Sequence, residues 1–314
     1  LQTLVSAAIN SGNLMISEEP QAAHAFIIAV PTPILDDKKA DMSYVVSATE
    51  AIVPYLKKDD LVILESTSPP RTTIDLVAPI LEKSGLKAGE DFDLAYSPER
   101  VLPGKILQEL VENTRVVGGV NKRSAEAGRE LYKAFVSSEI FLTDSTSAEM
   151  VKLMENTYRD VNIALANEFS RFSEEVQVDV WETIRLANKH PRVNILNPGP
   201  GVGGHCISVD PWFLVETSPE LTPLITTARN VNDSQPEFVL KRIKEIVGDL
   251  AGKKLALLGL AYKPNVDDLR ESPAIEVAEL CRYAGADCTV FEPFDTNFKL
   301  NGIRSAQSLE EAID

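Results

Sequence analysis

The sequence predicts an α/β fold in which two regions of alternating strands and helices flank a helical middle region. Short apolar runs at residues 25–30 and 61–65 each stop at a turn rich in Pro, Ser or Thr, which is typical of buried parallel strands. From residue 147 to about 178 the chain contains neither Pro nor Gly, which predicts one unusually long helix. From Lys253 onward, strand-like and helix-like segments alternate again.

The first region is expected to form a parallel sheet. Residues 42–57 carry apolar side chains at helical spacing, and residues 122–136 also have a helical pattern. Further strands are expected at 93–99 and 114–120. Strands that alternate with helices form right-handed βαβ units, which place neighbouring strands parallel.

The middle and last regions also show the patterns of helices and strands. Helices are expected at 178–190 and at about 234–249, with a Gly- and Pro-rich loop between them. In the last region, Ser272 is a good N-cap and Pro273 a good first residue for a helix, and the next strand covers 286–293. The expected domains are 1–143, 144–250 and 251–314.

The composition argues against several classes of protein. The 314 residues include 31 basic and 47 acidic side chains, and the net charge of −16 argues against nucleic-acid binding. No apolar run approaches the roughly 18 residues of a membrane span. Three cysteines without a CxxC pair, and three histidines, predict neither a disulfide framework nor a metal site.

The two ends of the chain also have recognisable patterns. The first residues, LQTLVSAAINSG, lack the basic segment and long apolar core of a signal peptide, so a cytoplasmic location is expected. They have a helical pattern and start without Met, and the last residues, SLEEAID, are helix-like as well. We therefore expect the chain to be a fragment that is cut at both ends.

The most informative segment is the loop PGPGVGGHC, which ends at Cys206 just before a helical stretch near Asp210. Four glycines in seven residues let the backbone approach a ligand closely and present N–H groups to it. A cysteine near a helix N-terminus can be a nucleophile that attacks a carbonyl group. The alternative is a small buried hydrophobic residue, which is what we expect of Cys281 and Cys288.

Two further segments carry polar groups that suit catalysis. Lys152 and Asn156 are four residues apart on the long helix and share a face, where they could polarise a hydroxyl group and bind water. A solvated helix face is the alternative. Glu99 follows a predicted strand, at the sheet edge where α/β proteins bind ligands, and is either a base or an ordinary loop carboxylate.

Two other strand ends are also polar, namely Val30-Pro31-Thr32 and Glu65-Ser66-Thr67. A threonine at a strand end often only caps a turn, but three polar strand ends in one sheet favour a binding site. No GxGxxG motif follows the first strand, so these residues alone do not establish a nicotinamide cofactor.

The chain resembles the UDP-glucose/GDP-mannose dehydrogenase family in segments spread along its whole length. These segments are AVPTP (29–33), ESTSPP (65–70), SPERVLPG (97–104), AEMVKLMENTYRDVNIALANE (148–168), HPRVNILNPGPGVGGHCISVDPWF (190–213) and GLAYKPNVDDLRESPA (259–274). The resemblance implies a truncated Rossmann-like parallel-sheet domain that binds NAD, a central all-helical dimerisation domain and a partial second Rossmann-like UDP-binding domain. Relative to the family, the first βαβ unit with its Gly-rich loop and the C-terminal end are missing.

The family oxidises the C6 hydroxyl of a UDP-sugar twice, to a carboxylate, with two NAD⁺ and a water. The resemblance implies that Cys206 forms a thiohemiacetal and then a thioester. Lys152 and Asn156 stabilise the oxyanion, and Asp210 positions the water or Lys152. Glu99 is the base that hydrolyses the thioester, with Thr67 assisting.

The resemblance also implies binding residues. Those for NAD are Val30, Pro31, Thr32, Ser66, Thr67 and Arg270. Those for the substrate are Arg100, Leu102, Lys152, Asn156, Arg192, Gly203 and Lys263. Arg100 stands where relatives that use glucose or mannose commonly have Phe, which favours an N-acetylated sugar, and UDP-N-acetylmannosamine is the expected substrate.

Three alternatives stay open at this stage. The first is another UDP-sugar, such as UDP-glucose. The second is a two-electron β-hydroxyacid dehydrogenase, which also has a Lys–Asn pair on a long helix but needs neither Cys206 nor a UDP domain. The third is a catalytically incomplete fragment that binds a UDP-sugar and dimerises. The long helix carries apolar residues, which predicts a homodimer or a higher homo-oligomer.

Overall fold

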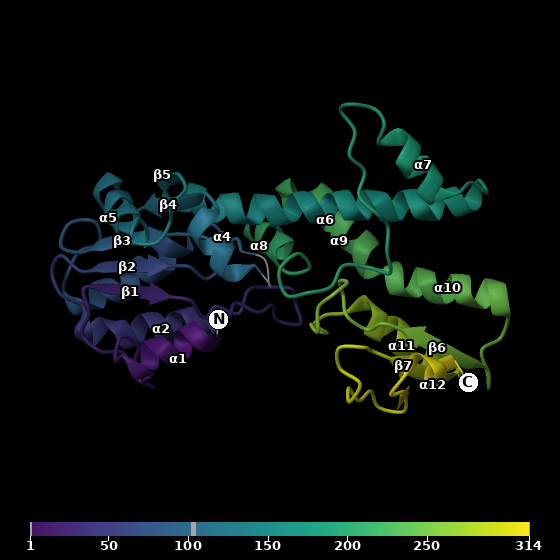
Figure 1. The fold of residues 1–314 in the computed structure, drawn as a ribbon. Helices are drawn as coiled ribbons and strands as arrows, with labels where there is room; N and C mark the ends of the chain where they lie inside the picture. Colours follow the sequence, from purple (N-terminus) through teal and green to yellow (C-terminus); the bar gives the residue numbers. More distant parts are fainter. Residues whose placement is uncertain (1, 102–104, 314) are drawn as a thin grey trace. The chain divides into compact units, whose positions relative to one another are not determined.

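The computed structural model describes residues 2–101 and 105–313 (Figure 1). The chain forms two compact units, one up to Met154 and one from Glu155 onward. The long helix α6 (Ser145–Glu175) contributes residues to both. Among the described residues, no helix is both long and apolar enough to cross a membrane.

The first unit contains a five-stranded sheet in the order β1-β2-β3-β4-β5. Its strands are β1 (Ala25–Ile28), β2 (Leu61–Leu64), β3 (Asp93–Tyr96), β4 (Arg115–Gly119) and β5 (Ile140–Asp144). Its helical segments before α6 are α1 (Gln2–Asn10), α2 (Ser43–Ile52), η1 (Val53–Tyr55), η2 (Thr73–Val77), α3 (Ala78–Leu81), η3 (Glu82–Ser84), α4 (Ile106–Glu112) and α5 (Lys122–Tyr132). The pairs β1–β2, β2–β3 and β4–β5 are parallel, as the sequence predicts.

The pair β3–β4 departs from the expected parallel arrangement. It is antiparallel, with Ala95 opposite Gly119 and Tyr96 opposite Gly118. Two antiparallel strands can be joined without a crossover from one end of the strands to the other. The connection that contains α4 therefore stays at the carboxyl end of β3. As a result, Arg115, the first residue of β4, lies beside the carboxyl end of β3.

Helices cover both faces of this sheet, with α2 on one side and α5 on the other (Figure 1). The residues of β2 alternate between the two cores. Val62 and Leu64 belong to the cluster that includes α2 and α3, whereas Leu61 and Ile63 belong to the cluster that includes Tyr132 of α5. Burial on both faces explains why β2, an interior strand of the sheet, is a continuous apolar run.

The second unit combines helices with a three-stranded sheet in the order β6-β7-β8. Its strands, all parallel, are β6 (Lys254–Leu258), β7 (Asp287–Phe291) and β8 (Arg304–Ser305). Its helices after α6 are α7 (Val180–Ala187), α8 (Asp210–Thr217), η4 (Pro219–Leu221), α9 (Pro223–Asp233), α10 (Gln235–Val247), α11 (Pro273–Tyr283) and α12 (Leu309–Ile313). Cys281 and Cys288 lie in its apolar core, which confirms the expectation for both.

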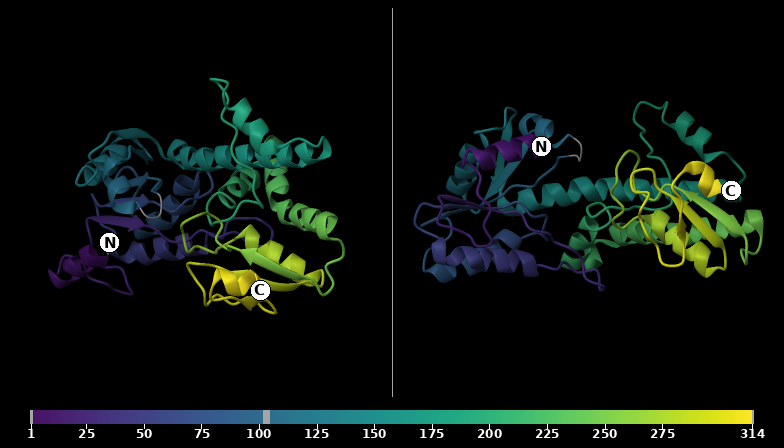
Figure 2. Two further views of the ribbon diagram at one scale, coloured as in Figure 1. Left: turned by 45° about the vertical axis from the view of Figure 1, so that its right-hand side comes forward. Right: turned by 60° about the horizontal axis from the view of Figure 1, so that its bottom comes forward.

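Helix α6 is one unbroken helix of 31 residues, seen from two further sides in Figure 2. It has a buried polar face made of Glu149, Asn156, Asp160 and Asn167, which are at most 6% exposed. Spacings of seven and four residues bring these side chains to one face of a helix. Buried polar groups require partners, so this face determines what packs on the helix.

The strongest contact of this polar face is with Arg229 of α9. The guanidinium is 1% exposed, and its Nη1 donates to Asp160 Oδ1 at 2.5 Å. Asn232 donates to the same oxygen at 2.8 Å and accepts a hydrogen bond from Asn167 at 2.9 Å. Asp233 also pairs with Arg229 but is 40% exposed. The pairing therefore joins α9 to α6 through a charge with little access to water.

The predicted α/β fold class is confirmed, and most expected elements occur within a few residues of their predicted ends. Ser272 caps α11 as predicted, because its Oγ accepts from Ala274 N at 3.3 Å. The sequence analysis did not single out α4, α9 or β5. The boundaries at 143/144 and 250/251 stay a prediction.

We predict that Asp160→Asn lowers the free energy of unfolding by about 3–5 kcal/mol, because it leaves the buried Arg229 charge without its buried counter-ion. Asp233→Asn is the matched control: it removes a half-exposed partner of the same guanidinium and is expected to cost about 1 kcal/mol or less. Urea unfolding of both variants measures the difference. An equal loss of unfolding free energy in the two variants would contradict Asp160 as the main counter-ion of Arg229.

Candidate active site

The loops that follow β1 and β2 are bound to each other at the carboxyl edge of the first sheet. Ser66 Oγ accepts from Val30 N at 2.9 Å and donates to Val30 O at 2.7 Å. Thr32 Oγ1 donates to Thr67 O at 2.7 Å. The structure thus brings together the polar residues that the sequence analysis singled out at these two strand ends.

Glu149 of α6 holds the segment that follows Thr67. Its carboxylate is 0% exposed and accepts from Arg71 N at 2.5 Å, Thr73 N at 2.8 Å and Thr73 Oγ1 at 2.6 Å. Burial raises the pKa of Glu149, while the hydrogen bonds from Thr73 and Arg71 oppose that shift. The sequence analysis missed this residue, although a Glu two turns before Asn156 on the same face was the available signal.

Arg115 joins two carboxylates at the same edge of the sheet. Its Nη2 lies 2.7 Å from Glu65 Oε1 and 3.4 Å from Glu99 Oε2. Its Nε donates to Ser97 Oγ at 3.0 Å, and its guanidinium carbon lies 3.9 Å from the centre of the Tyr132 ring. Sequence reasoning also missed Arg115, for which the signal was a cation that opens an otherwise apolar strand.

Lys152 of α6 and Glu99 after β3 lie together. Lys152 Nζ donates to the backbone carbonyl of Glu99 at 2.8 Å. The carboxylate of Glu99 also accepts from Arg100 N at 2.6 Å and Val101 N at 3.0 Å, which orients it. Its side chain is 36% exposed, so solvent reaches it.

In the second unit, Asn156 and Asp210 form a buried pair. Asn156 Nδ2 donates to Asp210 Oδ2 at 2.5 Å, and the two residues are 6% and 3% exposed. Asp210 is the first residue of α8, where the sequence analysis expected a helix to begin. Its backbone N–H donates to Cys206 O at 2.8 Å. Cys206 therefore lies in the turn that leads into α8, and it is partly exposed.

Gly203 and Gly204 press their backbone against another part of the chain. A Cβ atom at Gly203 would lie 2.5 Å from Tyr262 Cβ and 2.6 Å from Glu271 O. At Gly204, where φ is +83°, it would lie 2.9 Å from Tyr262 Cζ. The sequence analysis assigned such close approach to a ligand, but at these two positions the close neighbour is the protein itself. A role of Gly203 in substrate binding stays a prediction.

Arg270 lies beside the same loop, because its carbonyl accepts from Gly204 N at 3.0 Å. Its guanidinium binds both oxygens of Asp268, at 2.8 and 2.6 Å. Arg270 lowers the pKa of Asp268 to about 2. Lys263 lines a cavity of about 200 Å³ at the carboxyl ends of β6 and β7.

The other predicted residues are less closely connected. Arg100 donates to the carbonyl of Thr114. Arg192 lies in an exposed loop, and no hydrogen bond or ion pair of the described residues joins it to another predicted site residue. Leu102 lies outside the described residues. The described part of the chain contains no group of His, Cys, Asp or Glu side chains that could hold a metal ion.

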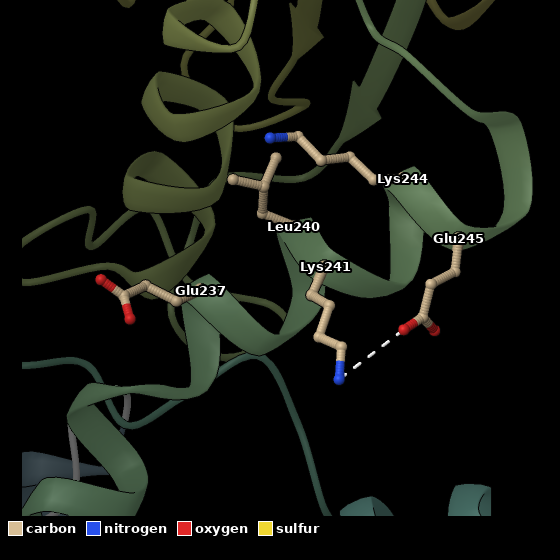
Figure 3. A pocket seen from close by; sticks show the side chains of 5 residues that line it. All are labelled: Glu237, Leu240, Lys241, Lys244 and Glu245. Carbon is tan, nitrogen blue, oxygen red and sulfur yellow. Dashed lines mark ion pairs between the residues drawn. The ribbon is translucent and has the colours of Figure 1, made fainter.

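A larger open cavity, of about 420 Å³, lies on α10 (Figure 3). It is lined by Glu237, Leu240, Lys241, Lys244 and Glu245, and Lys241 pairs with Glu245 at 3.7 Å. None of these is a predicted site residue. The predicted catalytic and binding residues therefore lie at the first sheet, at the Cys206 loop and beside Lys263, and not in the cavity on α10.

Models of three domains of one family match nearly the whole chain. The NAD binding domain of the UDP-glucose/GDP-mannose dehydrogenase family matches residues 1–136, its central domain 146–234 and its UDP binding domain 256–314. The chain belongs to the UDP-glucose/GDP-mannose dehydrogenase family. As a member of this family it is an NAD-dependent oxidoreductase that acts on nucleotide sugars.

Relatives within this family are similar over most of their length. The UDP-N-acetyl-D-mannosamine dehydrogenase of Methanocaldococcus jannaschii is 52% identical over 317 residues, which cover 100% of this chain and 71% of the relative. The solved UDP-N-acetyl-mannosamine dehydrogenase from S. aureus is 47% identical with a TM-score of 0.88, over 97% of this chain and 73% of that one. An NDP-N-acetyl-D-galactosaminuronic acid dehydrogenase of Ralstonia solanacearum is 53% identical over 284 residues, 88% of this chain and 67% of the relative.

The carboxyl edge of the first sheet is the candidate site for NAD. Dinucleotides bind outside the carboxyl ends of parallel strands, which is where Thr32, Ser66 and Thr67 lie. When bound, NAD⁺ supplies the hydride acceptor for the oxidation.

We predict that a thiol reagent labels Cys206 alone in the folded protein. Cys281 and Cys288 are 0% and 2% exposed, and burial raises the pKa of both thiols, that of Cys288 to about 11. At pH 8 only about one thousandth of a thiol with such a pKa is the reactive thiolate. Mass spectrometry of labelled peptides measures this, with the urea-unfolded protein as the control in which all three cysteines react.

Proposed function

We propose that the enzyme oxidises the C6 hydroxyl of UDP-N-acetyl-D-mannosamine to the carboxylate in two NAD-dependent steps. The identity of about half of all residues to relatives that carry this name supports the substrate. The single observation that carries the four-electron reaction is a partly exposed Cys206 beside the buried Asn156–Asp210 pair. A dehydrogenase that stops at the aldehyde has no use for a nucleophilic thiol.

The thiol keeps the reactive aldehyde bound between the two oxidations. In the first, C6 loses a hydride to NAD⁺ and its hydroxyl loses a proton, which produces the aldehyde. Cys206 Sγ adds to the aldehyde carbon and forms a thiohemiacetal. The second hydride transfer, to another NAD⁺, converts this adduct to a thioester. Water then displaces Sγ, which releases the carboxylate product and the free thiol.

Lys152 and Asn156 stabilise the charge that develops on the C6 oxygen. A cation and an amide donor that are fixed before the reaction lower the energy of an oxyanion most. The hydrogen bonds from Lys152 to Glu99 O and from Asn156 to Asp210 support such prior positioning. Asp210 accepts one N–H of the Asn156 amide and thereby fixes the direction of the other. Asp210 also orients Lys152 or the hydrolytic water.

Glu99 is the base that removes a proton from the hydrolytic water, and Thr67 assists in holding that water. Two backbone N–H groups orient one oxygen of the Glu99 carboxylate, while Arg115 approaches the other at 3.4 Å. Arg115 is bound more closely by Glu65, which leaves part of the Glu99 charge for proton transfer.

The cavity beside Lys263 receives the UDP diphosphate. A lysine ammonium with neighbouring backbone N–H groups is a common phosphate site. Arg100, Leu102, Arg192 and Gly203 contribute the remaining substrate contacts, and Val30, Pro31, Thr32, Ser66, Thr67 and Arg270 those of NAD. The same proposal assigns residues 1–143 to NAD, 144–250 to dimerisation and the Cys206 loop, and 251–314 to UDP.

A second candidate substrate is a nucleotide-linked N-acetylgalactosamine derivative. The Ralstonia relatives named for N-acetyl-D-galactosaminuronic acid are as similar to this chain as the mannosamine enzymes are. Both substrates carry an acetamido group, so this observation favours an N-acetylated sugar over UDP-glucose.

The enzyme is located in the cytoplasm. It forms a homodimer in which the outer face of α6 packs on the partner. Tyr158, Leu165, Phe169 and Phe172 are 38–66% exposed along this helix. Their spacing of three, four or seven residues forms one apolar stripe, which is the pattern of a helix that packs on a second helix. A second copy presents the same stripe and so matches it in length.

We predict that the full-length protein releases two NADH for each molecule of limiting UDP-N-acetylmannosamine. Cys206→Ser is expected to lose the second oxidation, because an alcohol is a far weaker nucleophile than a thiolate. Absorbance of NADH at the end point measures the ratio, and Cys281→Ser is the matched control, in which the ratio of two is retained.

One NADH per sugar that does not change in Cys206→Ser would overturn the thioester mechanism. Two NADH with UDP-glucose and none with UDP-N-acetylmannosamine would retain the mechanism and overturn the substrate. The N-acetylgalactosamine nucleotide is tested in the same way.

We predict that Phe172→Asp shifts the enzyme from dimer to monomer and raises the dissociation constant of the dimer at least about tenfold, as expected for an anchor residue at the centre of an interface. Sedimentation over a range of protein concentrations measures it. Tyr283→Asp is the control, because Tyr283 is an equally exposed aromatic side chain on α11. A stable dimer in Phe172→Asp would contradict the proposed interface.

A further inference from the structure

One segment of the second unit contacts both the Cys206 loop, residues 198–206, and the cavity beside Lys263. We call residues Leu260–Pro273 the strap. The ends of the strap are joined, because Ser272 Oγ donates to Leu260 O. Glu292 holds its beginning by accepting from Leu260 N at 2.7 Å and Ala261 N at 3.0 Å. A loop whose ends are fixed in this way moves as a unit.

The inner side of the strap is in van der Waals contact with the Cys206 loop. Tyr262 lies against Gly203 and Gly204 so closely that neither has room for a Cβ atom. The carbonyl of Glu271 faces Gly203, and the backbone of Glu271 has a φ of +49°, which is costly for a residue with a side chain. The Arg270 carbonyl binds Gly204 N. The conformation of the strap is therefore coupled to that of the loop.

The residues on either side of Tyr262 face the cavity. Ala261 and Lys263 line it together with Pro264, Asn265 and Val266, all of which belong to the strap. A ligand in this cavity touches the neighbours of Tyr262 in the sequence, and Tyr262 touches the loop that ends at Cys206. Burial raises the pKa of Tyr262, and the charges of Asp268 and Cys206 raise it further, so the hydroxyl stays neutral beside the thiol.

We propose that Tyr262 is a positioning residue through which a nucleoside diphosphate in the Lys263 cavity orders the Cys206 loop. When a nucleoside diphosphate occupies the cavity, it fixes the conformation of the strap. The ring of Tyr262 then fixes the backbone of Gly203 and Gly204. The thiol is thereby presented in one orientation only when a nucleotide is bound. This inference rests on the proposed function, in which Cys206 is the nucleophile and UDP occupies the cavity.

The first test measures how fast iodoacetamide alkylates Cys206 with and without saturating UDP. UDP is expected to slow the reaction at least about fivefold, since coupling between two sites is typically 5-fold or more. In Tyr262→Ala this ratio falls to about one, although calorimetry still detects UDP binding. Tyr262→Phe is expected to restore the ratio, because the ring makes the contacts. Tyr283→Ala, on an exposed face of α11, should retain the ratio.

The outcomes separate this inference from the proposed function. If UDP binds but does not change the alkylation rate of the wild type, the coupling is overturned and the function stands. If Tyr262→Ala binds UDP and retains the full ratio, UDP shields Cys206 directly, which also overturns the coupling. If UDP does not bind to the wild type, the proposed function fails and the coupling fails with it.

A measurement on the wild type keeps the inference testable if Tyr262→Ala does not fold. Hydrogen exchange of residues 198–209 is expected to slow at least fivefold when UDP is added. Exchange of α12 is the internal control, because none of its described residues lines the cavity beside Lys263. Unchanged exchange in residues 198–209 would overturn the proposal.

Discussion

The buried polar face of α6 is the constraint on which the rest of the molecule depends. Glu149, Asn156, Asp160 and Asn167 are almost inaccessible to water, so each must find a partner within the protein. Glu149 binds the segment after Thr67, Asn156 binds Asp210, and Asp160 binds Arg229. Asn167 accepts from Gly199 N at the start of the Cys206 loop. Helix α6 thus buries several polar residues and exposes several apolar ones, and the proposed dimer covers the exposed apolar side.

This arrangement positions reactive groups at little conformational cost. Lys152 and Asn156 are carried by a rigid helix, and the Cys206 loop contacts Asn167 on one side and the strap on the other. Groups that are oriented before substrate binds need no reorganisation during the reaction. The cost is paid in folding, where several polar groups and one full charge lose their water. The hydrogen bonds that replace water keep that cost low.

The sequence predicted the α/β class, most helices and strands and the residue types of the site, because periodicity and strand ends are local signals. It could not predict that β4 runs antiparallel to β3, since strand direction depends on the path of the connection. Arg115 and Tyr132 were missed because no local pattern places them beside Glu65, although both lie in correctly predicted segments. The glycines of the Cys206 loop were predicted as a ligand cradle, whereas two of them fit against Tyr262.

The resemblance to a family indicated a dehydrogenase, and the sequence by itself indicated an α/β fold with a candidate nucleophilic cysteine, a Lys–Asn pair and polar strand ends. These features depend on residue type and on spacing along a single helix, strand or loop. Only the tertiary structure decided which groups meet: Lys152 with Glu99, Asn156 with Asp210, and the glycine loop with Tyr262. Such pairs join residues some 50 positions apart, and no local pattern encodes them because they arise from the burial of polar groups that must be satisfied together.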